Sequence, residues 1–272
     1  MFGRVAVDPV TQREAVGRVM AALDAGQGGI VVTPNVDQLA QSAKQPALYQ
    51  FFERASLVLA DGAPLVLAAK LAQCPLPERV TGADLLWALT EAESARENGG
   101  IFLLGGAPGA ADRAADRVVE RFPTLRRPGT HCPPFGYEPD PDEFAAMVSA
   151  IQAYQPRIVF CGLGFPKQEG LATALSRVFP TVWFVGCGQA IAFAAGDVSR
   201  APKWMRENGI EWVHRLVTEP RRLASRYLGR DLPFAIKMMI GAVLRRSPVV
   251  PGPRPVVPGP RAAAVPRSGT AA

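Results

Sequence analysis

Short apolar runs alternate along the chain with longer segments of mixed polarity. Five mainly apolar runs predict buried β-strands, at residues 29–33, 56–60, 101–104, 157–161 and 182–185. The segments between them have helical length, at residues 65–72, 84–97, 110–122, 142–154 and 168–179. This alternation is typical of a mostly parallel sheet with helices on both faces. We therefore expect an α/β fold.

Beyond residue 197 the pattern changes to helices alone. Pro202 and Pro220 each suit the first turn of a helix, and in the second helix Arg222 and Arg226 would share one face. The last 25 residues hold seven prolines and three glycines without apolar periodicity, which is typical of disorder. We divide the chain into a core at residues 1–196, a basic helical appendage at residues 197–246 and a disordered Pro/Gly/Arg tail at residues 247–272.

Glycine or polar residues follow every predicted strand. In parallel α/β sheets this is the edge where ligands bind, so the residues after the strands are the candidates for a site. The five turns contain the sequences TPNVD, DG, GGAPG, GLGFPKQE and GCGQ, which begin at Thr33, Asp61, Gly105, Gly162 and Gly186. Their convergence on one edge is a stronger signal than any single turn.

Two of these turns, GGAPG and GLGFPKQE, suit a phosphate-bearing ligand. Glycine lets the backbone approach a ligand closely, and a helix N-terminus offers free N–H groups to an anion. Neither turn has the GxGxxG or P-loop spacing, which disfavours a dinucleotide oxidoreductase. A tight turn or an exposed helix start is the alternative for each. The candidate substrate-binding residues are Gly105, Gly106, Gly164, Lys167, Gln168, Glu169, Gly186 and Gly188.

Asp61 directly follows an apolar run and precedes Gly62. A carboxylate at this edge can take a proton from an attacking hydroxyl, although capping of the next helix remains an equal alternative. Thr33 and Asn35 share this ambiguity. Asp37 is better suited to be a cap or a hydrogen-bonding partner than a second base.

Positive charge is concentrated in the predicted appendage. Residues 1–195 carry 16 Lys and Arg against 19 Asp and Glu, whereas residues 196–246 carry 11 against 5. Basic residues interleaved with aromatic ones suit a lipid headgroup interface or a diphosphate. Surface solubility and ion pairing with Glu211 and Glu219 are the alternatives. No nucleic-acid-binding motif is present, so we expect no nucleic-acid partner.

Other features narrow the class of protein. His131 and His214 belong to no metal-ligand spacing, and the four cysteines lack CxxC spacing, so we expect reduced thiols and no metal. The N-terminus lacks the apolar run of a secretory signal, and no run reaches the roughly 18 residues that span a bilayer. The apolar segment Leu232–Leu244 suits an interfacial helix, or packing onto the core or an oligomer interface. These features favour a cytoplasmic protein.

Taken in order, eight segments resemble the WecG/TagA/CpsF group, glycosyltransferase family 26, typified by teichoic-acid N-acetylmannosaminyltransferases. They are TPNVD, ADGAPLV, ERVTGADLL, FLLGGAPG, PPFGY, IVFCGLGFPKQE, AGDVSRAPKWMRENGIEWVHRL and EPRRLASRYL, from Thr33 to Leu228. The resemblance implies a Rossmann-like core with a helical C-terminal appendage. It also implies inverting transfer of a sugar from a UDP-sugar to a polyprenyl-diphosphate-linked acceptor, with no metal and no cofactor.

The resemblance also assigns roles. Asp61 matches the family's proposed catalytic base, Thr33 and Asn35 match a polar pair near the sugars, and Gln168 matches the glutamine of the PKQE block. The arginines that close over the donor diphosphate and help docking on an anionic membrane are matched by Arg215, Arg222 and Arg226. The resemblance implies a peripheral enzyme of cell-surface polysaccharide synthesis on the inner face of the membrane. It leaves self-association into a homo-oligomer open.

One block departs from the family pattern. Many members carry G-x-G-x-x-x-D-F-x-x-G after the fifth strand, where this chain reads GCGQAIAFAAG with Ala192 at the acidic position. This departure leaves the sugar specificity open. It also keeps a non-catalytic nucleotide-binding module of the same fold as the alternative function.

Overall fold

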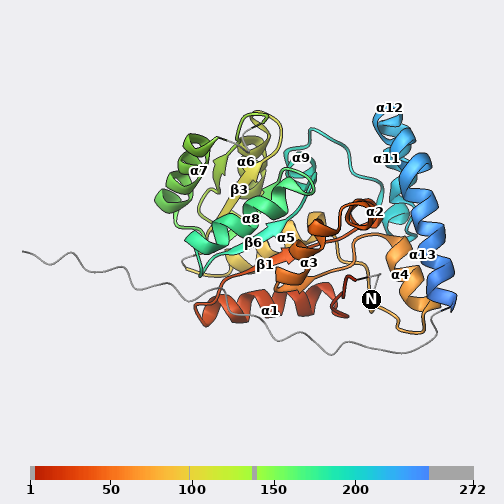
Figure 1. Cartoon of the computed structure of the whole chain (residues 1–272). Helices are drawn as coiled ribbons and strands as arrows, with labels where there is room; N and C mark the ends of the chain where they lie inside the picture. The colour runs from red at the N-terminus through yellow and green to blue at the C-terminus, as the bar shows by residue number, and fades with distance from the viewer. Residues whose placement is uncertain (1–3, 98, 137–139, 245–272) are drawn as a thin grey trace, which may run out of the picture.

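The computed structural model describes residues 4–97, 99–136 and 140–244 and contains one parallel sheet of six strands (Figure 1). The strand order is β2-β1-β6-β5-β3-β4, and every neighbouring pair is parallel. The strands are β1 (Gly29–Val32), β2 (Leu57–Val58), β3 (Ile101–Gly105), β4 (Gly129–His131), β5 (Ile158–Gly162) and β6 (Trp183–Gly186). The structure confirms the predicted α/β, Rossmann-like fold.

Helices cover both faces of the sheet. One face carries α1 (Gln12–Asp24), α5 (Gly82–Ser94), α6 (Ala110–Arg121) and α9 (Ala190–Ala195). The other carries α2 (Val36–Lys44), the short 3₁₀ helix η1 (Pro46–Leu48), α3 (Tyr49–Arg54), α7 (Pro141–Tyr154) and α8 (Lys167–Val178). Within β5, Ile158 and Phe160 pack into the first core cluster, while Val159 packs into the second. Because successive side chains point to opposite faces, a strand buried on both sides reads as a continuous apolar run.

All five strands predicted from apolar runs are present. The sixth, β4, pairs only with β3 at the edge of the sheet, and its three residues are partly exposed. Since an edge strand need not be apolar on both faces, Gly129–His131 shows no run that would identify it. The sequence patterns also did not identify α1, α3 and α9, although α2 follows the polar turn at Asn35 as expected.

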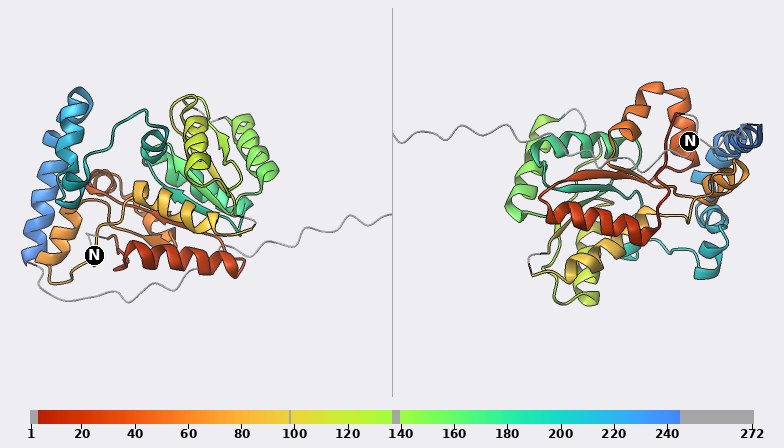
Figure 2. Two further views of the ribbon diagram at one scale, coloured as in Figure 1. Left: turned by 180° about the vertical axis from the view of Figure 1, so that it is seen from behind. Right: turned by 90° about the horizontal axis from the view of Figure 1, so that it is seen from below.

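From Lys203 onward the described C-terminal segment consists of helices joined by short turns, and it stands with α4 (Ala63–Leu71) at one end of the molecule (Figures 1 and 2). It contains α10 (Lys203–Glu207), α11 (Glu211–Thr218), α12 (Pro220–Arg226), the π-helical turn η2 (Tyr227–Asp231) and α13 (Leu232–Leu244). Pro220 begins α12 as predicted, and the bounds of α13 match the apolar segment. Residues 245 and 246 and the predicted tail at 247–272 lie outside the described residues. In the described chain, no helix combines the length and hydropathy that a membrane span requires.

Candidate active site

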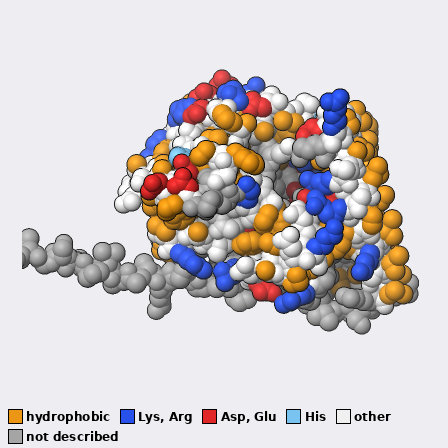
Figure 3. All heavy atoms as spheres, turned by 45° about the horizontal axis from the view of Figure 1, so that its top comes forward, with side chains coloured by type: hydrophobic (Ala, Val, Ile, Leu, Met, Phe, Trp, Pro, Cys, Tyr) orange, Lys and Arg blue, Asp and Glu red, His pale blue; other side chains and the backbone are white. Residues whose placement is uncertain are grey.

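A cavity of about 420 Å³ lies where the carboxyl ends of β1, β2 and β6 meet the C-terminal helices. Its volume is typical of a pocket for a small ligand. Figure 3 shows the molecule hollowed beside the C-terminal helices, with Lys and Arg side chains gathered on the rim of the hollow. The predicted site residues that line the cavity are Thr33, Asn35, Asp61, Gln168, Gly188, Arg215 and Arg226.

Asp61 stands between β2 and α4 and faces the cavity. The N-cap of α4 is Gly62, so Asp61 does not cap this helix. Burial raises the pKa of the Asp61 carboxyl to about 6, against the opposing effect of the positive charges of Arg215 and Arg79. At neutral pH the carboxylate is therefore ionised but more basic than an ordinary aspartate, as a general base requires.

Thr33 and Asn35 shape the neighbouring wall. Thr33 is buried directly after β1, and its hydroxyl donates to the carbonyl of Gly186 over 3.4 Å, which links the ends of β1 and β6. The Asn35 side-chain oxygen accepts from the backbone N–H of Gln38 over 3.1 Å and caps α2. Asn35 is thus both a helix cap and a residue of the cavity wall.

Gln168 joins two of the glycine turns. Its side-chain oxygen accepts from the backbone N–H groups of Gly164, over 3.2 Å, and Gly188, over 3.0 Å. Its amide nitrogen donates to Glu169 over 2.8 Å. Glu169 is buried, and burial raises the pKa of its carboxyl to about 7. Gln168, in the first turn of α8, therefore holds together the turns that follow β5 and β6.

Several predicted binding residues lie outside the cavity lining. These are Gly105, Gly106, Gly164, Lys167, Glu169 and Gly186. The Lys167 ammonium lies 4.9 Å from the centre of the Phe135 ring. A Cβ atom on Gly186 would lie 2.9 Å from the Gln168 amide nitrogen, so a larger residue there would displace the Gln168 side chain. Substrate binding by these six residues stays a prediction.

Two of the three predicted appendage arginines reach the cavity. Arg215 on α11 pairs with Glu211 over 3.2 Å, and its guanidinium lies over the Phe193 ring at 5.2 Å. Arg226 on α12 pairs with Asp37 over 3.1 Å. Asp37 is therefore an ion-pair partner and not the cap of α2. Arg222 belongs to α12, but its side chain lies outside the described part of the structure.

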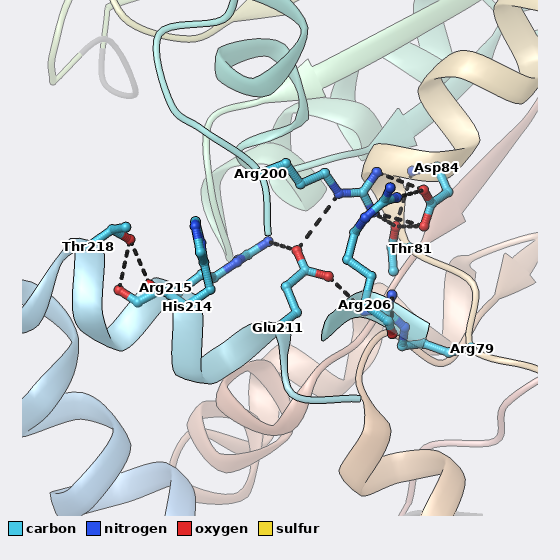
Figure 4. A network of polar contacts seen from close by, with 9 residues as sticks. All are labelled: Arg79, Thr81, Asp84, Arg200, Arg206, Glu211, His214, Arg215 and Thr218. Carbon is cyan, nitrogen blue, oxygen red and sulfur yellow. Dashed lines mark hydrogen bonds and ion pairs between the residues drawn. The ribbon is translucent and has the colours of Figure 1, made fainter. Parts of the chain in front are cut away.

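Glu211, which the sequence analysis named only as an alternative ion-pair partner of the basic segment, is a buried carboxylate that organises this wall. Glu211, at the start of α11, accepts from Arg79 over 3.0 Å and from Arg215 over 3.2 Å, and the Arg200 guanidinium lies 3.8 Å away (Figure 4). Burial disfavours ionisation of Glu211, but the three positive charges hold the pKa of its carboxyl below the usual value. Glu211 thus keeps three guanidinium groups together beside Asp61.

Arg79 is a further site residue that the sequence patterns missed. It lines the cavity, and its charge acts on Asp61. It lies on the irregular segment between α4 and α5, so neither a strand end nor a helical periodicity predicts that it belongs to a site. Arg200 is held in turn by Asp84, whose two carboxylate oxygens lie 2.7 and 2.9 Å from its terminal nitrogens. Figure 4 shows this second pair beside Glu211.

The other residues named from the sequence have different positions, with Cys187 lining the cavity and His214 on α11 next to Arg215. His131 is on β4, and its Nε2 atom lies 2.6 Å from Glu143. All four cysteines are free thiols, with Cys161 and Cys187 buried as expected. Among the described residues, no group of three His, Cys, Asp or Glu side chains is placed to hold a metal ion. Ala192 is partly buried on α9, beside Phe193, which lines the cavity.

Comparison with known proteins identifies the family. The model of the WecG/TagA/CpsF glycosyl transferase family matches residues 1–248. The N-acetylglucosaminyldiphosphoundecaprenol N-acetyl-β-D-mannosaminyltransferase of Bacillus spizizenii is 30% identical over 200 residues, which cover 74% of this chain and 75% of the relative. The Staphylococcus aureus enzyme of the same name is 28% identical over 193 residues, 71% of this chain and 73% of the relative. The chain therefore belongs to the WecG/TagA/CpsF family of glycosyltransferases.

Proposed function

We propose that this protein transfers a sugar from a UDP-sugar to a polyprenyl-diphosphate-linked acceptor, with inversion at the anomeric carbon and without a metal. The names of the relatives support a diphosphate-linked polyprenol as the acceptor class. The observation that carries the proposal is the position of Asp61, a carboxylate of raised pKa in a cavity that is also lined by Arg79, Arg215 and Arg226.

The reaction is a single displacement. Asp61 takes the proton of an acceptor hydroxyl, whose oxygen forms a bond to the anomeric carbon of the donor. The bond from this carbon to the diphosphate breaks, and its electron pair leaves with UDP. Because the nucleophile attacks opposite the leaving group, the configuration inverts.

The leaving diphosphate gains negative charge during this step. Arg79 and Arg215 both pair with Glu211. Arg226 pairs with Asp37 and Asp231. These ion pairs orient each guanidinium at the cavity before a ligand binds. Oriented cations stabilise developing charge without reorganisation, and removal of one such donor typically costs about 100- to 1,000-fold in rate. These arginines stabilise the negative charge of the leaving diphosphate, as a metal ion does in other transferases.

The proposal extends to the place of action. The basic C-terminal helices would lie against the anionic inner face of the membrane, where a lipid-linked acceptor is held. Under this proposal residues 1–196 form the transferase core, and the helices after residue 197 complete the site at the membrane. The product would serve bacterial cell-surface polysaccharide synthesis.

A UDP-release assay tests this function. A panel of UDP-sugars is offered with an N-acetylglucosamine-diphosphate acceptor on a short prenyl chain, in the presence of EDTA. We expect acceptor-dependent release with one donor, an inverted product by NMR, and no turnover by Asp61→Asn, which still binds UDP. The exposed Asp112→Asn variant is the matched control and should be fully active. UDP binding without release from any donor would favour the non-catalytic nucleotide-binding module.

A further inference from the structure

An apolar groove of about 450 Å³ lies between α4 and α13, directly outside the cavity. Leu67 forms one side, and Leu232, Ile236 and Ile240 form the other. No charged residue of the described chain lines this groove. Figure 3 shows apolar side chains along the outer edge of the C-terminal helices.

Helix α13 is apolar on two faces. Phe234 and Met238 pack against the second core cluster. Leu232, Ile236 and Ile240 recur every four residues on the groove face, and their exposed fractions are 51%, 51% and 56%. A helix that is apolar on more than one face normally buries each face against a partner. Helix α4 lies beside the groove face but leaves these three side chains about half exposed, so the face can take an apolar ligand.

The groove continues the cavity. Both spaces are lined by the same residues at their junction, among them Ala63 and Pro64 of α4 and Trp212 of α11. Trp212 is 49% exposed, and its ring meets that of Tyr227 edge-on at 6.4 Å. One ligand can therefore pass from the arginine-lined cavity into the groove. Such a ligand would carry an anionic group at one end and an apolar chain at the other.

We propose that the groove binds the first isoprene units of the polyprenyl chain while the attached diphosphate lies in the cavity. This inference rests on the proposed function. From Leu232 to Ile240 the helix rises about 12 Å, which gives the groove the length of a few isoprene units. A flexible apolar chain that starts at the cavity can lie along this groove, because the two spaces are continuous. The rest of the chain leaves the protein beyond Ile240.

Binding of farnesyl diphosphate and inorganic diphosphate tests the groove without catalysis. Calorimetry below the micellar concentration should give a dissociation constant at least about 10-fold lower for farnesyl diphosphate, because its chain buries apolar surface. The double variant Ile236→Ser/Ile240→Ser should lose most of this preference and bind inorganic diphosphate unchanged. The control Val217→Ser/Leu244→Ser alters side chains that are 74% and 78% exposed and do not line the groove, so it should keep the preference. Equal affinity of the wild type for both ligands overturns the inference.

Turnover separates this inference from the proposed function. The N-acetylglucosamine-diphosphate acceptor is prepared with a methyl, geranyl or farnesyl group and assayed without vesicles. We expect KM to fall with chain length, and the groove variant to raise KM about 10-fold for the farnesyl acceptor and to leave KM for the methyl acceptor unchanged. A groove variant that weakens only binding to anionic vesicles would make the membrane the occupant and overturn the inference. If no acceptor reacts while the farnesyl preference persists, the groove assignment stands and the proposed function fails.

Discussion

Arg226 on α12 lies 3.1 Å from the carboxylate of Asp37 on α2, so the C-terminal helices are tied to a residue near the start of the chain. Asp37 also pairs with Arg230, and Arg226 also pairs with Asp231 over 3.2 Å. Both Asp37 and Arg226 line the cavity. The pair therefore sets where α12 stands relative to the sheet edge, and it holds a guanidinium in the site before any ligand arrives.

Asp37→Asn should weaken the site without removing any group from the reaction. Loss of the carboxylate leaves Arg226 and Arg230 with only Asp231, so the Arg226 guanidinium is less well oriented toward a diphosphate. We expect the affinity for UDP and kcat/KM to fall by about 10-fold, since the pair is only partly screened by solvent. Calorimetric UDP titration and initial rates measure both effects. Asp116→Asn, which breaks an exposed pair with Arg127, is the control and should leave both values unchanged.

Glu211→Gln should impair catalysis through the arginines it holds. Without the carboxylate, Arg79 and Arg215 lose their ion pairs with Glu211 while Arg200 keeps Asp84, and we expect kcat/KM to fall by about 100-fold. The negative charge of Glu211 also raises the pKa of Asp61, so the acid limb of the pH–rate profile should move to lower pH in the variant. A fall in rate with an unmoved profile would assign Glu211 a purely structural role. Asp24→Asn, which removes an exposed carboxylate shared by Arg96 and Arg157, is the matched control.

The strands and the sheet edge could be predicted because burial on both faces leaves a direct mark on the sequence. The apolar runs at Ile101–Leu104 and Val182–Val185 identified β3 and β6, and the residues after β1 and β2 brought Thr33, Asn35 and Asp61 to the cavity. These predictions follow from strand geometry alone, because parallel strands end at a common edge.

The partners of the arginines could not be predicted in the same way. Two ion pairs join residues that are at least 132 positions apart, Glu211 with Arg79 and Asp37 with Arg226. They form only because α11 and α12 pack beside the carboxyl edge of the sheet. Ion pairing of the basic segment with Glu211 was expected as an alternative and is present, whereas the charge pattern did not indicate Asp37, Asp84 or Asp231 as partners. Similarly, Gln168 lines the cavity as predicted, but the sequence did not indicate that its side-chain oxygen accepts from two backbone N–H groups.

Gly209→Ala should displace the C-terminal helices from α4. Gly209 has a positive φ of 71°, and a Cβ atom there would lie 2.5 Å from the Cβ atom of Ala63. Because Gly209 and Ala63 lie at the junction of the cavity and the groove, relief of this clash must open that junction. We expect a loss of about 1 to 3 kcal/mol in the free energy of unfolding and a clear fall in kcat/KM. Urea unfolding and rate assays check this, with Gly229→Ala, which meets no atom within 4 Å, as the silent control.

The pH dependence of the rate should report the ionisation of Asp61. A base acts only when deprotonated, so kcat/KM should rise with unit slope below pH 6 and level off above it. If the base were an ordinary exposed aspartate, this rise in kcat/KM would instead lie near pH 3.8, the usual aspartate pKa. The profile is measured with saturating acceptor and limiting donor. A rate that does not change between pH 5 and pH 7 would falsify the assignment of Asp61 as a base with this pKa.

Asp61 should also make the protein less stable as pH rises. Its folded-state pKa of about 6 lies above the ordinary value of 3.8, so the native state holds a proton that the unfolded chain has released between these two pH values. The free energy of unfolding therefore falls as pH rises through this window, by up to about 3 kcal/mol, and the loss persists above pH 6. Asp61→Asn removes this ionisation and should be inactive yet more stable than the wild type at pH 7.5, with a smaller difference at pH 4. Urea unfolding at both pH values measures the two differences, and a variant that is less stable at pH 7.5 would show that the ionised carboxylate is instead well accommodated in the fold.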